Sequence, residues 1–154
     1  MPRSPISTVK PDTIATSILT VATRKPGFTD ITNEVAGFLD EARAREGAAH
    51  LHVRHTSASL TVQENADPDV LADLMTALDG FAPQDADYRH HMEGPDDMPA
   101  HIRTMLTATS LTVPVLGGKL ALGTWQGLYL AEHRARPHRR EVLLQFIGSK
   151  RVVR

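Results

Sequence analysis

The sequence predicts an α+β fold with a mostly antiparallel, β-sandwich-like core and about three helices packed outside it. Segments rich in β-branched residues and segments with helical spacing follow one another, but without the regular strand–helix alternation of a doubly wound fold. The 154 residues suffice for one ordinary domain, and 41% hydrophobic with 23% charged residues is a globular balance. We expect a loose leader over residues 1–11 and a single domain over residues 12–150.

The element order supports this fold class. We expect a strand, a helix that ends before Gly47, two strands, two helices and four strands, over residues 13–23, 31–46, 49–56, 59–63, 68–80, 98–106, 111–115, 120–122, 123–134 and 139–147. The first segment, TIATSILTVAT, is dense in β-branched residues, which favour strands, and Lys25-Pro26-Gly27 ends it. In the next two strands the alternation of apolar and polar residues indicates one buried face.

Each helix is predicted by its apolar spacing and its start signal. Asp30 or Thr29 can cap the first helix, where apolar residues recur at helical spacing. Asp67 caps the second, with proline at its first position. Asp97 is the expected cap of the short third helix, which we expect to bury Met105.

The last four strands are predicted by alternation around glycines. Gly117-Gly118 makes a hairpin turn between two alternating segments. The strand over 123–134 contains two glycines, which weaken a strand and mark a bulge or a close approach. We expect Trp125 of this strand to lie in the core, with a stacking platform as the alternative.

The composition excludes several classes of protein. Lys plus Arg is 17 against 18 Asp plus Glu, and the net charge of −1 argues against a nucleic-acid surface. The absence of Cys excludes disulfides, thiolate metal sites and a cysteine nucleophile. No apolar run approaches the ~18 residues of a membrane span, and the first residues lack a signal-peptide stretch. We therefore expect a soluble, cytoplasmic protein without membrane or nucleic-acid partners.

Charge is distributed unevenly along the chain. Residues 1–132 carry 10 basic and 17 acidic side chains, whereas residues 133–154 carry 7 and 1. The basic end can complement the rest of the fold or a neighbouring subunit. Alternatively, some of its arginines hold an anion, since guanidinium binds phosphate bidentately. Arg134 and Arg139 are the candidates.

Four polar stretches carry the candidate chemistry. They are HTSAS (55–59), ENAD (64–67), YRHHMEGPDDMPAH (88–101) and GTWQGLYLAEHR (123–134). The first contains a nucleophile with its base, or else hydroxyls that satisfy a tight turn. In the third, His90, Asp96 and His101 could hold a divalent metal through nitrogen and oxygen ligands, or belong to a solvated loop of mixed charge.

These stretches resemble the YjbQ-like family, also called the secondary thiamine-phosphate synthase family. The similarity covers about residues 12–148 and rests on HTSASLTVQENADPDV (55–70), YRHHMEGPDDMPAHI (88–102) and SLTVPVLGGKLALGTWQGLYLAEHR (110–134). Ala108 departs from the glycine that family members tend to have, at a turn before a strand.

The resemblance implies a homotrimer with sites near its subunit interfaces. It also implies a weak thiamine-phosphate synthase activity, which joins a hydroxymethylpyrimidine diphosphate to a thiazole phosphate and releases pyrophosphate. The site residues it implies are His55, Ser57, Glu64, Asn65, His90, Asp96, His101, Gln126 and His133.

Within this set we expect three metal ligands, His90, His101 and His133, on a divalent ion, Mg²⁺ or Zn²⁺. The other six residues are expected to be catalytic, and His50, His52 and His138 to lie outside the cluster. Two alternatives remain open: a metal-dependent hydrolase of phosphate esters, and a non-catalytic trimer that holds a metal or an anionic metabolite. For both enzymes the expected substrate is a phosphorylated small molecule.

Overall fold

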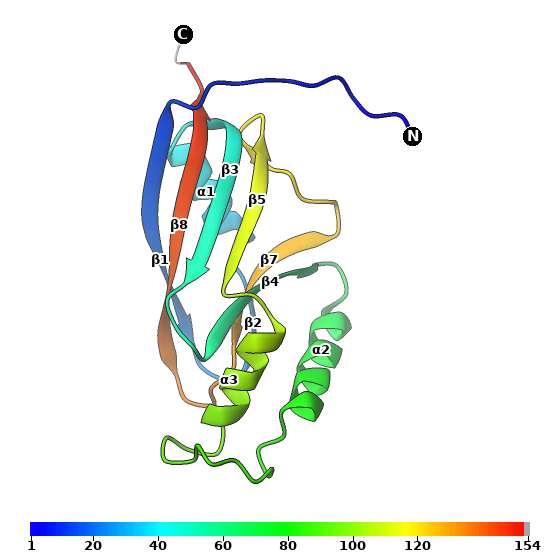
Figure 1. Ribbon diagram of the computed structural model, residues 1–154, viewed down its shortest axis with the longest axis vertical. Helices are drawn as coiled ribbons and strands as arrows, with labels where there is room; N and C mark the ends of the chain where they lie inside the picture. The colour runs from blue at the N-terminus through cyan, green and yellow to red at the C-terminus, as the bar shows by residue number, and fades with distance from the viewer. Residues whose placement is uncertain (153–154) are drawn as a thin grey trace.

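Two antiparallel sheets and three helices make up residues 1–152, the part of the chain that the computed structural model describes (Figure 1). In chain order the elements are β1 (Thr13–Thr23), β2 (Gly27–Asp30), α1 (Thr32–Glu41), β3 (Ala44–Val53), β4 (Ala58–Glu64), α2 (Pro68–Phe81), α3 (Asp97–Leu106), β5 (Ser110–Leu116), β6 (Lys119–Leu120), β7 (Gln126–Glu132) and β8 (His138–Lys150). The expected α+β class is confirmed.

The larger sheet has the order β1-β8-β3-β5-β6, and the smaller one the order β2-β7-β4. β8 lies between β1 and β3, so that the last strand of the chain pairs with the first along its whole length. Apolar residues on the facing sides of the two sheets form the core, among them Leu51 and Phe146 from the larger sheet and Leu60 and Leu130 from the smaller. These alternate with outward-facing residues, as expected for strands with one buried face.

The three helices are placed differently. α1 lies behind the larger sheet in Figure 1, and its Val35 and Leu39 belong to the core. α2 and α3 stand side by side at the lower end of the smaller sheet (Figure 1). α2 buries less of its surface, since Leu78 is its one buried residue and is still 8% exposed. α3 carries one of the expected site residues, His101, and begins directly after another, Asp96.

Several expectations about the elements were wrong. β2 was expected to be part of a turn, and β3 begins at Ala44, five residues earlier than expected. β7 begins only at Gln126, which leaves Trp125 outside the strand and 64% exposed. Met105 of α3 is likewise exposed rather than buried.

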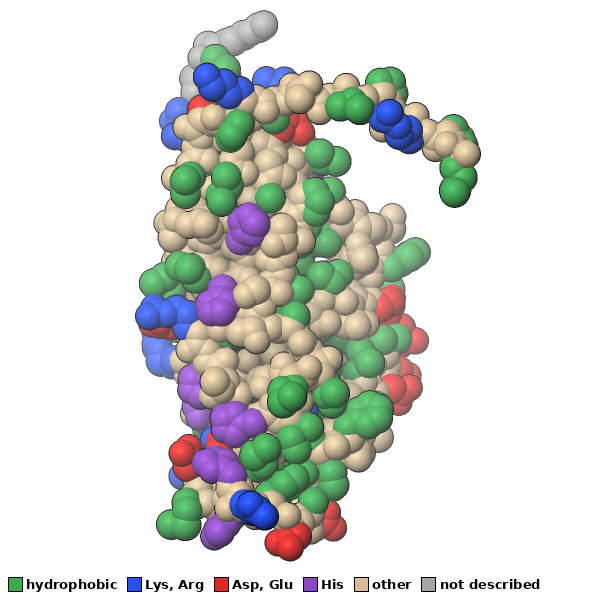
Figure 2. Space-filling view, in the orientation of Figure 1, with side chains coloured by type: hydrophobic (Ala, Val, Ile, Leu, Met, Phe, Trp, Pro, Cys, Tyr) green, Lys and Arg blue, Asp and Glu red, His purple; other side chains and the backbone are tan. Residues whose placement is uncertain are grey.

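The outer face of the larger sheet is uncovered within the described residues. Its exposed apolar side chains include Ile14, Ile18, Leu116 and Ile147. Figure 2 shows histidines gathered along this side of the molecule, down to its lower end. Residues 1–12 are exposed and form no helix or strand. This N-terminal segment extends away from the sheets (Figure 1). None of the helices described is long and apolar enough to cross a membrane.

Candidate metal centre

Three side chains meet at the lower end of the molecule in a geometry suited to a metal ion. His90, Asp97 and His101 each offer one ligand atom, and these atoms lie within 4.8 Å of one another. The Nε2 atoms of His90 and His101 lie 2.7 and 3.3 Å from the same carboxylate oxygen, Oδ2 of Asp97. Two imidazoles and a carboxylate form a ligand set found in many metal centres.

The start of α3 explains why these residues converge. Asp97 is the first residue of the helix and His101 lies one turn later, so both side chains point from the same face. His90 approaches from the long loop between α2 and α3. Asp97 is therefore not the cap that we expected. Asp96 occupies the capping position, without a side-chain capping bond.

His101 is oriented as metal-binding histidines commonly are. Its Nδ1 atom lies 3.1 Å from the backbone oxygen of Thr56. A carbonyl oxygen can only accept, so Nδ1 carries a proton, and Nε2 is the nitrogen that faces the other ligand atoms and would bind a metal ion. Metal-binding imidazoles usually donate their other N–H to a carbonyl or carboxylate in this way. The donor set thus fits a metal ion.

Arg134 holds the acidic residues of this end together. Its Nε lies 3.1 Å from Oδ2 of Asp96, Nη1 binds the carboxylate of Asp97, and Nη2 lies 2.8 Å from the backbone oxygen of Glu93. Burial raises the pKa of Asp97, but the hydrogen bond with His90 and the charge of Arg134 outweigh this and hold the pKa below its usual value. Asp97 is therefore an anion at neutral pH, and all three guanidinium nitrogens of Arg134 are engaged.

A second polar network supports the corner between β3 and β4. The side chains of Glu132 and Arg140 are almost fully buried and form two hydrogen bonds, of 2.6 and 2.7 Å. Arg140 also donates to Oγ of Ser57 at 3.1 Å, and Ser57 contacts Nδ1 of His55 at 3.0 Å. Although burial raises the pKa of Glu132, the bonds from Arg140 and Thr23 keep it lowered.

His133 does not join the metal-ligand group in this structure. It is completely buried behind β4, where its Nε2 lies 2.8 Å from Oγ of Ser59 and its Nδ1 has no hydrogen-bond partner among residues 1–152. Burial, helped by the charge of Arg103, lowers the pKa of His133 to about 4. The side chain is therefore neutral at pH 7 and belongs to the interior of the fold.

Three expected catalytic residues lie at the opposite end of the smaller sheet. Glu64 accepts hydrogen bonds from the backbone N–H groups of Ala66 and Asp67, and Asn65 donates to the backbone oxygen of Gln126. In the β4–β7 pairing, six residue steps separate Glu64 from Ala58, next to the corner with His55. This corresponds to about 20 Å. Within one chain Glu64, Asn65 and Gln126 thus form a separate group.

Some participants were not recognised in the sequence. Asp97 takes the place that we assigned to Asp96, which instead accepts from Arg134 and from the backbone of Ala135. Arg139 is exposed on β8, whereas its neighbour Arg140 points inward. In each case two adjacent residues of one type face different directions, and the sequence alone gave no means to choose between them.

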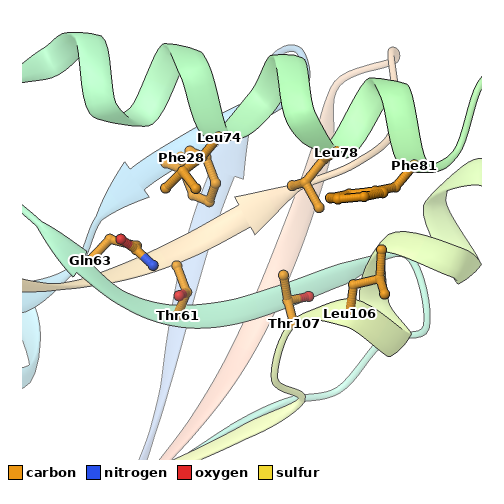
Figure 3. Close-up of a pocket in the computed structure, with 8 residues that line it drawn as sticks. All are labelled: Phe28, Thr61, Gln63, Leu74, Leu78, Phe81, Leu106 and Thr107. Atoms are coloured by element: carbon orange, nitrogen blue, oxygen red, sulfur yellow. The ribbon is translucent and has the colours of Figure 1, made fainter.

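The surface has hollows at both ends of α3. At the metal-ligand group a hollow of about 250 Å³ is lined by Tyr88, His90, His91 and neighbouring loop residues. A second, of about 340 Å³, lies between α2, β4 and the end of α3, and its walls are mainly apolar: Phe28, Leu74, Leu78, Phe81 and Leu106 (Figure 3). Only the first adjoins the polar residues described above.

The chain matches a family model described as UPF0047 protein YjbQ-like, over residues 17–149. A UPF0047 protein of Synechocystis is 48% identical over 133 residues, which are 86% of this chain and 90% of that protein. The UPF0047 protein YjbQ of Escherichia coli O157:H7 is 40% identical over 85% of this chain and 96% of its own length.

Solved structures show the same arrangement of elements. A crystal structure of a YjbQ/UPF0047-family protein from Clostridium acetobutylicum has a TM-score of 0.79 and 38% identity, covering 84% of this chain and 98% of its own. A protein of Aeropyrum pernix has a TM-score of 0.81 and 29% identity, covering 88% and 99%.

Proposed function

The chain belongs to the YjbQ-like family, UPF0047, and we propose that it is a metal-dependent enzyme that acts on phosphorylated small molecules. The observation that carries this proposal is the convergence of His90, Asp97 and His101 beside a hollow of the surface. The tautomer of His101 and the anionic state of Asp97 both prepare these side chains to be ligands.

The donor set favours Zn²⁺ over Mg²⁺. Imidazole nitrogen suits zinc and other transition ions, whereas Mg²⁺ prefers an octahedron of oxygen ligands. Three protein ligands leave a position for substrate or water, as in catalytic zinc sites. His90, Asp97 and His101 would hold the ion, and His133 would not.

The favoured reaction is the one that the family resemblance implies. The thiazole nitrogen attacks the methylene carbon of hydroxymethylpyrimidine diphosphate, a C–N bond forms, and the C–O bond to the diphosphate breaks with its electron pair. A bound metal would supply positive charge to the leaving diphosphate. No enzyme nucleophile is needed, which agrees with the engagement of the Ser57 hydroxyl by His55 and Arg140.

We further propose that the protein is a homotrimer. The uncovered apolar face of the larger sheet, with Ile14, Ile18, Leu116 and Ile147, is the kind of surface that subunit contacts cover. In such a trimer, Glu64, Asn65 and Gln126 of one subunit would lie beside the metal-ligand group of a neighbouring subunit. Both the trimer and its sites at interfaces are implied by the family resemblance.

Product analysis tests this function. The full-length protein, loaded with Zn²⁺, is incubated with hydroxymethylpyrimidine diphosphate and thiazole phosphate, and the products are separated. We expect thiamine phosphate and pyrophosphate in equal amounts. A chelator should abolish turnover, and His101→Ala should reduce it by ~10²-fold or more, as loss of one electrostatic stabiliser does.

The matched control is His52→Ala. His52 is exposed on β3, where its ring contacts Ser110 outside the metal-ligand group. This variant should retain the wild-type rate. Orthophosphate without a joined product would instead indicate a phosphate-ester hydrolase. Equal rates for wild type, His101→Ala and chelated protein would refute the metal-dependent function.

A further inference from the structure

The corner between β3 and β4 fixes which nitrogen of His55 carries a proton. The backbone N–H of Ser57 donates to Nδ1 of His55 over 3.1 Å. A backbone N–H can only donate, so Nδ1 must present its lone pair. In the neutral ring the proton is therefore on Nε2.

The hydroxyl of Ser57 reinforces this tautomer. Its oxygen lies 3.0 Å from the same Nδ1 atom and accepts a hydrogen bond from Nη2 of Arg140 at 3.1 Å. Because Arg140 can only donate and Nδ1 already presents its lone pair to the backbone N–H of Ser57, the hydroxyl proton points to Nδ1 of His55. Two donors thus converge on one ring nitrogen.

This arrangement is built into the interior of the fold. Ser57 and Arg140 are 1% and 2% exposed, and Glu132, at 1%, holds the guanidinium through both carboxylate oxygens. His55 itself is exposed, and its Nε2 has no hydrogen-bond partner among residues 1–152. The buried network therefore presents one N–H of His55 to the solvent.

We propose that His55 serves as a neutral hydrogen-bond donor, through Nε2–H, to a phosphate oxygen of the substrate, and that Ser57 and Arg140 are its positioning residues. The phosphate as ligand rests on the proposed function. The next residue, Thr56, accepts the hydrogen bond of His101, so the corner serves two imidazoles of opposite tautomer. His101 offers a lone pair to a metal, whereas His55 offers a proton to an anion.

The charges around His55 agree with a neutral ring. Burial lowers the pKa of His55, and the charges of Arg140 and Arg134 lower it further, against the opposing effect of Glu132. His52 provides an internal comparison, because within the described part of the chain its Nδ1 contacts a single group, the hydroxyl of Ser110, at 2.6 Å. A hydroxyl both donates and accepts, so that contact does not select one tautomer.

The tautomer can be read by ¹⁵N NMR of the imidazole rings in the full-length protein at pH 7, with His55→Gln to assign the signal. We expect His55 to show a protonated Nε2 and a bare Nδ1, and His52 to show a mixture. Adding Zn²⁺ should perturb His101 and leave the Nε2 proton of His55 in place. A proton on Nδ1 of His55, or Zn²⁺ bound at its Nε2, would overturn the proposal.

The donor role is tested with inorganic pyrophosphate as the probe, by titration calorimetry. A hydrogen bond to a charged group corresponds to about tenfold or more in affinity. His55→Ala should lose about that factor, and His55→Gln, whose amide can still donate, should lose less. Equal affinities for wild type and His55→Ala would exclude the donor role. If the tautomer and the binding are as expected but no turnover occurs, the inference about His55 stands and the proposed reaction fails.

Discussion

At the residue scale, Asp97 occupies the centre of the site. One carboxylate oxygen faces the imidazoles of His90 and His101, and the other faces the guanidinium of Arg134. The carboxylate is 3% exposed, so its charge depends on these partners rather than on water. A change at Asp97 should therefore affect both stability and metal binding.

We expect Asp97→Asn to weaken Zn²⁺ binding by about a hundredfold or more, since the loss of even an outer-shell partner costs 10–100-fold. The free energy of unfolding should fall by about 1–3 kcal/mol, the penalty for a buried group left without its partner. Calorimetry and denaturant unfolding measure the two effects. Asp87→Asn, in the exposed loop before α3, is the control and should change neither. Wild-type zinc affinity in Asp97→Asn would contradict the assignment.

The buried His133 predicts how stability depends on pH. Its pKa is about 4 in the folded chain and about 6.5 when unfolded. Between these values the unfolded state binds the proton that the folded state refuses, so stability falls as the pH drops from 6.5 to 4. The loss attributable to this residue is on the order of 3 kcal/mol.

Denaturant unfolding at several pH values tests this, with His133→Gln as the comparison. The variant lacks the titrating ring, so its disadvantage relative to wild type should shrink as the pH falls towards 4. A constant difference between the two proteins across this range would show that His133 is not held neutral by burial.

The kinds of residue at the metal-ligand group could be predicted from the sequence, but which of two adjacent side chains points into the group could not. The loop with His90 and the helix with His101 were expected to meet at a carboxylate, and they do. The carboxylate is Asp97 rather than Asp96, because the helix begins one residue earlier than a capping role for Asp97 requires. His133 was expected to be a ligand because it lies at the end of an expected strand. That position does not reveal that its ring is buried against Ser59 of β4.

At the element scale, the pairing of β3 with β8 brings two glycines into contact. A Cβ atom on Gly47 would lie 2.2 Å from the backbone oxygen of Ile147, and one on Gly148 would lie 2.2 Å from that of Glu46. No side chain fits between these strands at this point. The site depends on this pairing, because β8 carries Arg140 and β3 leads to His55.

Gly47→Ala should therefore destabilise the protein by about 1–3 kcal/mol or more, the range for overpacking. Gly37→Ala is the matched control. Gly37 lies inside α1 with nothing within 4 Å of the added methyl group, so the helix should gain about 1 kcal/mol from alanine. Thermal unfolding of both variants checks this, and a neutral Gly47→Ala would be inconsistent with the close approach.

These glycines also explain what the sequence could not predict about the elements. Gly47 was taken as the end of the first helix, and so the start of β3 was placed after it. The pairing with β8 shows instead that Gly47 lies against the backbone of Ile147, where a side chain would not fit. The four residues of β2 and the exposed Trp125 were missed for a similar reason. β2 is defined by its pairing with β7, and β7 begins at Gln126, where its pairing with β4 ends at Glu64. The long β1, by contrast, was predicted with its observed bounds from its β-branched residues.

At the scale of the whole molecule, the proposed trimer has a direct test. Light scattering at micromolar concentration should give three times the 16.9 kDa of one chain. The apolar outer face of the larger sheet supplies the expected contact, and an interface that holds should bury roughly 1,000 Å² or more. A mass of one chain would contradict the trimer. Glu64, Asn65 and Gln126 would then be too far from the metal-ligand group to act with it.

The central claim is that His90, Asp97 and His101 hold a metal ion. Anomalous diffraction at the zinc edge, from crystals of the Zn²⁺-loaded protein, tests it most directly. We expect a peak about 2.0–2.2 Å from Nε2 of His90, Nε2 of His101 and a carboxylate oxygen of Asp97. A zinc peak bound by other residues, with these three side chains still in contact with one another and no metal between them, would contradict it.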